Sequence, residues 1–230
     1  MPSTLGFMRL LVIEHESDSG AALLGRRAVE RGFTLDVRSP KEMTLPTTTE
    51  EYDAVLSLGA SPSVNDPAVS GWLQPLIALL QDADARTVPI LGVCFGAQAL
   101  AVALGGSVQR ASAPEVGWYE IDTSAPDLVE PGPWLQWHVD AVTPPPGATV
   151  LATSAVCVQA YALGPHLAVQ FHPEVTIDEV RRWSEGDPGG PASAGTDAPT
   201  ILGRFTDEFP AAIHRANRLF DRFLTHAGLS

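Results

Sequence analysis

The amino-acid sequence predicts an α/β fold in which a mostly parallel β-sheet is covered by helices on both faces and carries an added antiparallel section. Two observations support this prediction. Up to Gly106, short apolar runs alternate with longer segments of helical periodicity, as in chains that form parallel sheets. From residue 107 to 172, several short β-type runs follow one another without a convincing helical segment, which is typical of antiparallel pairing.

The first half of the chain is expected to alternate between strands and helices. Two of its helices end at glycines, Gly32 and Gly105, and another begins with Pro67 in its first turn. The expected strands cover 10–14, 34–38, 52–58 and 88–93. The first expected helix ends near residue 31, and the next two cover 67–83 and 97–104.

The second half is expected to contain short strands followed by two helices. The expected β runs are 107–110, 118–122, 134–137, 149–152, 156–163 and 167–171. A short helix is expected over 176–183, and helical spacing of apolar residues predicts a terminal helix over 207–224. Residues 185–200 are rich in Gly, Pro, Ala, Ser and Asp, so we expect a mobile surface loop there and a candidate lid. We expect one domain over 8–230, after a loose leader at 1–7.

The composition indicates an ordinary globular protein. The chain has 230 residues, of which 45% are hydrophobic and 18% charged, and its formal net charge is −13. An acidic chain without a basic cluster is a poor candidate for binding nucleic acid or an anionic membrane. Two cysteines make no disulfide framework, which favours a reducing, cytoplasmic setting. No export signal or apolar stretch of about 20 residues is recognisable.

Cys94 stands at a predicted turn between a strand and a helix. The apolar run 88–93 leads directly into it, and Gly92 and Gly96 flank it. Small residues on both sides let the backbone turn sharply, as in a nucleophile elbow. The N-terminus of the following helix favours the reactive thiolate. The alternative is a buried core cysteine, a frequent role of this residue.

His172 is the histidine best placed to act as a base. It ends the apolar run 167–171, and Pro173 and Glu174 follow. Proline favours an extended backbone before it, which places the imidazole at the end of the strand. A carboxylate two residues on can hold the ring N–H and stabilise an imidazolium. The alternative is a surface turn. The second cysteine, Cys157, lies in a β-type run and is interpreted as a core residue.

Residues 92–98 and 171–174, which read Gly-Val-Cys-Phe-Gly-Ala-Gln and Phe-His-Pro-Glu, resemble the class I (triad) glutamine amidotransferases. Residues 57–64 look like the oxyanion loop of that family, and residues 114–118 and 137–140 look like its substrate-holding segments. The resemblance covers roughly residues 10–184, with the motifs in the expected order, and points to the stand-alone, GMP-synthase-like branch.

The resemblance implies a flavodoxin-like fold and a Cys94–His172–Glu174 triad that releases ammonia from glutamine through a γ-glutamyl thioester. It also implies an oxyanion hole made by the backbone N–H of Phe95 and one from Gly59 or Ala60. The substrate-binding residues that it implies are Gln98, Gly117, Trp118, His138 and Val139.

One stretch departs from the family pattern. The family usually has Gly-Gly-Pro in its oxyanion loop, where this chain has Gly59-Ala60-Ser61. The Cβ atom of Ala60 makes a flipped peptide less accessible there. Catalysis in the family needs no cofactor, and no phosphate-binding Gly-rich loop occurs. Ammonia would therefore pass to a separate synthase subunit. His138 is read as a backbone contact, so no metal site is expected.

Two alternatives stay open. The same triad could act as a γ-glutamyl hydrolase on γ-glutamyl amides or conjugates, without a partner. The fold could also serve as a non-catalytic binding or regulatory protein. The intact Cys94–His172–Glu174 set argues against this second alternative, and the altered loop at Ala60 argues mildly for it.

Overall fold

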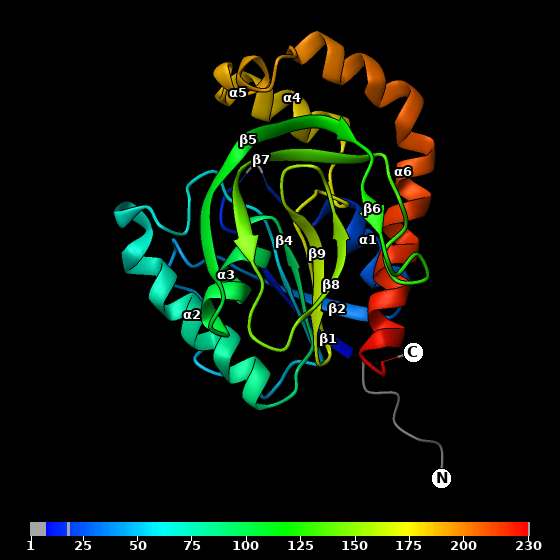
Figure 1. Ribbon diagram of the computed structural model, residues 1–230. Coiled ribbons are helices and arrows are strands. Elements are labelled where there is room, and N and C mark those ends of the chain that lie inside the picture. The colour runs from blue at the N-terminus through cyan, green and yellow to red at the C-terminus, as the bar shows by residue number, and fades with distance from the viewer. Residues whose placement is uncertain (1–7, 18, 230) are drawn as a thin grey trace.

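The computed structural model describes residues 8–17 and 19–229, so the leader expected at 1–7 lies outside the described residues. Its main sheet contains eight strands: β1 (Met8–Ile13), β2 (Phe33–Arg38), β3 (Ala54–Ser57), β4 (Ile90–Val93), β6 (Asp122–Thr123), β8 (Thr149–Thr153), β9 (Val158–Leu163) and β10 (His166–Val169). They are ordered β2-β1-β3-β4-β10-β9-β8-β6 (Figure 1). The first five in this order are parallel and the last three pair antiparallel.

Helices cover both faces of this sheet, which confirms the predicted layered α/β fold. On one face lie α1 (Ala22–Glu30) and the long α6 (Ala198–His226), and on the other lie α2 (Ser70–Ala85), preceded by a 3₁₀ turn at Pro67–Val69, and α3 (Phe95–Ala103) (Figure 1). The buried side chains of β1 alternate between the two cores, as the period of a strand requires. None of the helices in the described part of the chain is long and apolar enough to cross a membrane.

A second, two-stranded antiparallel sheet is formed by β5 (Ser107–Tyr119) and β7 (Trp134–Thr143). In Figure 1 this ribbon arches over the main sheet, with α4 (Ile177–Gly186) and α5 (Gly189–Ser193) beyond it. The sequence predicts separate runs at 107–110 and 118–122, of which the second spans the end of β5 and the start of β6. Strand β5 is continuous, with a register shift between Arg110 and Glu115. The shift re-aims the side chains that follow it.

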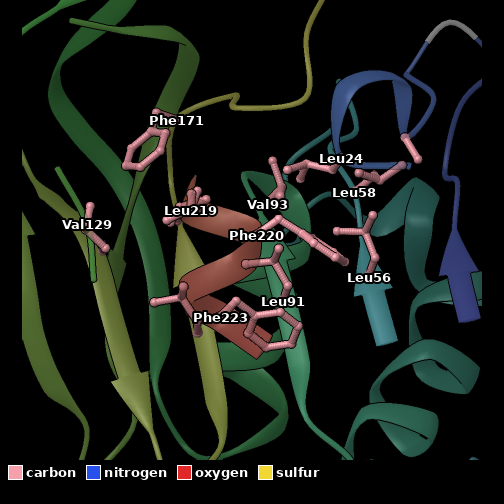
Figure 2. Close-up of a cluster of buried hydrophobic side chains, with 14 of the residues drawn as sticks. Leu24, Leu56, Leu58, Leu91, Val93, Val129, Phe171, Leu219, Phe220 and Phe223 are labelled. Carbon is pink, nitrogen blue, oxygen red and sulfur yellow. The ribbon is translucent and has the colours of Figure 1, made fainter. Parts of the chain in front are cut away.

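The core between the sheet and α6 is made of large side chains without solvent exposure. Figure 2 shows where α6 meets the sheet, through Leu219, Phe220, Phe223, Leu56, Leu91 and Val93. Each of these six side chains is at most 1% exposed. Their burial fixes α6 against the strands that carry the site described below.

The segment 185–200 differs from its prediction. It contains the end of α4, all of α5 and the start of α6, so the absence of regular structure expected there is wrong. Helix α6 also begins nine residues earlier than expected, because the Asp197 side chain accepts a hydrogen bond from Thr200 N and Ile201 and Phe205 pack against the β5–β7 ribbon. The sequence alone does not indicate this start, because Ile201 and Phe205 become a buried face only when the β5–β7 ribbon packs against them. The mobility of the segment stays a prediction.

Replacing Phe220 by alanine is expected to lower the free energy of unfolding by roughly 3–5 kcal/mol, because a fully buried ring is lost and a cavity remains. Denaturant unfolding followed by circular dichroism measures this loss. Val29→Ala, at a position that is 57% exposed on α1, is the control and should change stability by about 0.5 kcal/mol or less. An equally small change for Phe220→Ala would mean that α6 is not packed as described.

Candidate active site

Three of the residues predicted for the site follow parallel strands at one edge of the main sheet. Cys94 directly follows β4, Gly59 comes two residues after β3, and His172 comes three residues after β10. Because these strands are parallel neighbours, their carboxyl ends meet at the same edge. This is the edge at which open α/β sheets bind their ligands.

Cys94 is held in a strained backbone conformation. Its φ of 49° and ψ of −108° are unusual for a residue that carries a side chain. The turn is anchored on both sides, since Cys94 N donates to Val169 O at 2.8 Å and Gly96 N donates to Leu58 O at 3.0 Å. Strain of this kind persists only where surrounding contacts enforce it, and it is commonly found at functional sites. The structure therefore has the elbow that the sequence predicted.

The two glycines beside Cys94 have separate steric reasons. A Cβ atom on Gly96 would collide with the carbonyl oxygen of Ser57 at the end of β3. A Cβ atom on Gly92 would lie 2.9 Å from Ala97 N, closer than real Cβ contacts. The helix that follows the elbow can thus approach the sheet only because both positions lack a side chain.

His172 and Glu174 form a buried pair close to Cys94. His172 Nδ1 lies 2.8 Å from Glu174 Oε1, and the side chains are at most 5% exposed. Burial alone lowers the pKa of His172, but the charges of Glu174 and Cys94 outweigh it and raise this pKa to about 10. The ring packs against Trp183, with centroids 4.8 Å apart, and a Cβ atom on Gly59 would lie 3.0 Å from its Cε1.

Gln170 is a site residue that our reading of the sequence missed. Its Nε2 donates a hydrogen bond to Cys94 Sγ at 3.5 Å, and its Oε1 accepts one from Gln98 Nε2 at 3.2 Å. Gln98 lies in the first turn of α3, as expected, and is held by this contact. An amide donor beside the sulfur stabilises a thiolate. The available signal was a lone amide in the otherwise apolar run 167–171.

The loop expected to supply an oxyanion donor is fixed by a carboxylate. Glu16 Oε2 accepts hydrogen bonds from Ser61 N at 2.8 Å and Ser61 Oγ at 2.6 Å. Ser61 N is thereby occupied, whereas no hydrogen bond from Ala60 N is present in the described ranges. Ala60 is not among the residues with positive φ. Phe95, as the first residue of α3, has a backbone N–H with no partner inside the helix.

A pocket of about 540 Å³ is lined by Cys94 and His172, whereas the predicted site residues Gly59, Phe95 and Glu174 are not part of its wall. Six of the residues predicted for the site line it: Ala60, Cys94, Gln98, His138, Val139 and His172. Arg110 and three aspartates, Asp66, Asp140 and Asp187, add charge to its wall. The volume lies within the usual range for small-molecule sites.

Gly117 and Trp118 are not brought to this pocket. The wall of the pocket contains Val116, whereas Gly117 and Trp118 line a separate, smaller hollow with Ile201. Trp118 is buried against Phe205 of α6, with ring centroids 5.3 Å apart. Substrate contacts by these two residues stay a prediction, and in the structure they join the ribbon to α6.

Cys157 differs from Cys94 in its surroundings. Both are free cysteines, and Cys157 is partly exposed rather than fully buried. Burial, followed by the nearby charge of Glu115, raises the pKa of the Cys157 thiol to about 12. The thiol is therefore protonated at neutral pH and is a weak nucleophile.

His15 packs next to the Cys94 elbow. It follows β1 and packs against Phe95 and Trp72, with ring centroids 5.0 and 5.7 Å away. It has no solvent exposure, and neither ring nitrogen makes a well-formed hydrogen bond to a described residue, although backbone groups of Leu58 and Gly59 lie near. Burial lowers the pKa of His15 to about 3.

The buried His15 predicts a loss of stability in acid. Below pH 6.5 the unfolded chain binds a proton at His15 and the folded chain does not, so stability should fall toward pH 3 by up to about 1.4 kcal/mol per pH unit. The His15→Phe variant should lose this share of the pH slope in denaturant titrations. His214→Gln, on the outer part of α6, is the matched control. An unchanged slope in His15→Phe would contradict the neutral, buried state.

Comparison with known proteins agrees with the class of protein that the elbow and the His–Glu pair define. A family model described as "Glutamine amidotransferase class-I" matches residues 12–182, which is most of the chain. The chain therefore belongs to the class-I glutamine amidotransferase family. This confirms the resemblance inferred from the motifs around Cys94 and His172.

Curated relatives are similar to this chain to different extents. GMP synthase (glutamine-hydrolyzing) of Pyrobaculum aerophilum is 34% identical over 163 residues, which cover 67% of this chain and 30% of the relative. One subunit of the GMP synthase of Saccharolobus solfataricus is 36% identical over 139 residues, 56% of this chain and 71% of the relative. The first alignment thus spans under a third of that relative.

Among solved structures, a glutamine amido transferase from Methylobacillus flagellatus superposes with a TM-score of 0.88 at 25% identity, covering 96% of each chain. A glutamine amidotransferase from Thermotoga maritima gives a TM-score of 0.85 at 26% identity, covering 95% of this chain and 99% of that one. These likenesses confirm the predicted fold over nearly the whole chain.

Proposed function

We propose that this chain hydrolyses the side-chain amide of glutamine, with Cys94 as nucleophile, His172 as acid and base, and Glu174 as the group that orients His172. One observation carries the proposal. The strained Cys94 elbow opens onto a pocket that it shares with His172, and a buried carboxylate holds the other side of that imidazole at 2.8 Å. Nucleophile, base and orienting group are the three parts that covalent acyl transfer requires.

The reaction proceeds in two halves. The Cys94 sulfur attacks the amide carbon, and the proton of its thiol goes to His172 Nε2. His172 then gives this proton to the departing nitrogen, which leaves as ammonia, and a γ-glutamyl thioester remains. In the second half His172 accepts a proton from water while the water oxygen attacks the thioester. Glutamate leaves, and the proton returns to the sulfur.

The raised pKa of His172 favours the first step. An imidazolium close to the sulfur stabilises the thiolate, and the buried Glu174 carboxylate stabilises the imidazolium in turn. Gln170 adds a hydrogen bond to the same sulfur. The negative oxygen that forms on the carbonyl would be bound by the backbone N–H groups of Phe95 and of Gly59 or Ala60.

Charged groups on the pocket wall suit the amino-acid end of glutamine. Arg110, whose side chain is 74% exposed, can meet the α-carboxylate, and Asp140 can meet the α-ammonium. The two lie 3.9 Å apart, so they can bind neighbouring groups of opposite charge. The backbone at His138 and Val139 lines the same wall.

We propose that the released ammonia is passed to a separate acceptor enzyme. The name of the relative from Saccharolobus solfataricus describes one subunit of a glutamine-hydrolysing GMP synthase, which fits a glutaminase that works beside a separate synthase chain. The proposal also includes one domain over 8–230. It includes a cytoplasmic location, because both cysteines are free thiols, as is usual in a reducing compartment.

Release of ammonia and glutamate from glutamine, measured with purified protein, tests the activity. Cys94→Ala should abolish turnover, because the thioester cannot form. An electrophilic glutamine analogue should label Cys94 and spare Cys157, as shown by peptide mapping. Cys157→Ala is the matched control and should keep its turnover on glutamine. Absence of Cys94-dependent turnover, alone or with candidate synthase partners, would favour a non-catalytic binding protein.

A second candidate function is hydrolysis of γ-glutamyl amides or conjugates without a partner. The pocket of about 540 Å³ favours it, because sites of this size hold molecules larger than a single amino acid. In the same assay, Cys94-dependent turnover of γ-glutamyl conjugates but not of glutamine would support this function and replace the first.

Gln170→Leu should lower the rate of Cys94 alkylation at neutral pH by roughly 10-fold or more, because a hydrogen bond to a charged sulfur is lost. Gln109→Leu, at an exposed position on β5, is the control. If both variants react like the wild type at neutral pH, Gln170 does not stabilise the thiolate.

A further inference from the structure

A cluster of three metal-binding residue types lies outside the set that carries the proposed hydrolysis. Glu115 on β5 and His138 on β7 are directly paired across the ribbon, and Cys157 precedes β9 of the main sheet. One ligand atom from each lies within 4.8 Å of the other two. Glu115 Oε2 is 3.1 Å from His138 Nε2 and 3.8 Å from Cys157 Sγ. Three separate strand segments thus converge on one point.

The ring nitrogens of His138 differ in their contacts within the described part of the chain. Nδ1 lies 3.0 Å from the backbone oxygen of Asp140, which can only accept, so Nδ1 must carry a proton. Nε2 is buried and makes no hydrogen bond to any described residue, although it is close to the Glu115 carboxylate. A ring nitrogen and a carboxylate oxygen thus lie 3.1 Å apart without a hydrogen bond between them. A cation bound by both atoms would join them.

We propose that Glu115, His138 and Cys157 bind a thiophilic divalent cation, with Zn²⁺ as the best match. Carboxylate, imidazole and thiolate are the ligands that Zn²⁺ takes in proteins. With bonds of about 2.0–2.3 Å, the ligand atoms of a tetrahedral site lie roughly 3.3–3.7 Å apart. The distances of 3.1 and 3.8 Å around Glu115 Oε2 need only small shifts to reach this range, and the third pair, His138 and Cys157, lies within 4.8 Å and would move closer on binding. The proton of the Cys157 thiol leaves to solvent on binding.

The surroundings of the cluster supply the outer contacts of a metal site. The Asp140 carbonyl fixes the tautomer and orientation of His138, as partners of ligating histidines do. Gln159 Nε2 donates to Glu115 Oε2 at 2.8 Å, and Gln136 holds Gln159 in turn. Ser154 Oγ, 3.0 Å from Glu115 Oε2, or a water molecule can complete the four ligands.

Such a cation would connect the β5–β7 ribbon to the main sheet. Glu115 and His138 belong to the ribbon, whereas Cys157 adjoins β9. Cys157 is partly exposed, which gives the cation a path from solvent. His138 also lines the large pocket, so the cation would stiffen one pocket wall. The role is structural and does not depend on glutamine hydrolysis. The proposal differs from the expectation from the sequence that no metal is bound. The sequence could not show this cluster, because Glu115 and Cys157 are 42 residues apart in the chain and meet only after folding.

Titration of the full chain with Co²⁺ tests the proposal, because Co²⁺ occupies zinc sites and its bond to a thiolate absorbs in the near ultraviolet. The Cys94→Ser variant is used, so that Cys157 is the only thiol. We expect one Co²⁺ per chain with the thiolate band, displaced by Zn²⁺. The band should vanish in Cys94→Ser/Cys157→Ser, and Glu115→Gln should weaken Co²⁺ binding by at least about 10-fold.

Thermal unfolding supplies a second readout. Zn²⁺ should raise the Tm of Cys94→Ser and leave that of Cys94→Ser/Cys157→Ser unchanged, since binding to the folded state stabilises it. Circular dichroism verifies that each variant is folded. The proposal is overturned if folded Cys94→Ser shows no thiolate band, or if Co²⁺ binding is the same with and without Cys157 and Glu115. Either result would leave the cluster as a hydrogen-bond network around Glu115.

Discussion

The strained backbone at Cys94 is the constraint that governs the rest of the site. A non-glycine residue with φ of 49° is unfavourable by itself and needs its neighbours to hold it. The sheet holds this one through the hydrogen bond from Cys94 N to Val169 O of β10 and that from Gly96 N to Leu58 O, just after β3. Helix α3 can close on the sheet only because Gly92 and Gly96 lack side chains. The strained elbow therefore depends on contacts with both the sheet and α3. These contacts place Cys94 in the wall of the pocket.

Electrostatics at the carboxyl edge of the sheet follow from the same geometry. Burial of a charged imidazole is unfavourable, and only the buried Glu174 and the nearby sulfur make it favourable at His172. His15, in a neighbouring buried position where no described carboxylate is bonded to its ring, is kept neutral instead. At this edge of the sheet, the neighbouring groups therefore favour a charged ring at His172 and a neutral ring at His15. This difference supports the proposal that His172 transfers protons, whereas His15 packs beside the elbow.

The β5–β7 ribbon turns the bare sheet edge into a pocket. It supplies Val116, His138 and Val139 to the wall, and α6 holds it from outside through Phe205 against Trp118. The long α6 therefore has two tasks, since its C-terminal half fills the core beneath the sheet while its N-terminal turns secure the ribbon. The Glu115, His138 and Cys157 cluster lies where this ribbon meets the main sheet.

Local sequence was enough to predict the alternation of strands and helices, the elbow at Cys94 and the pairing of His172 with Glu174, because each depends on residues close together in the chain. Contacts between distant segments became visible only in the folded chain. Folding joins Gln170 to the Cys94 sulfur, places Glu16 on Ser61, keeps Gly117 and Trp118 outside the pocket and extends α6 across a segment expected to be a loop. These contacts gain their stability from burial and hydrogen bonding between elements, which leave no periodic signal in the local sequence.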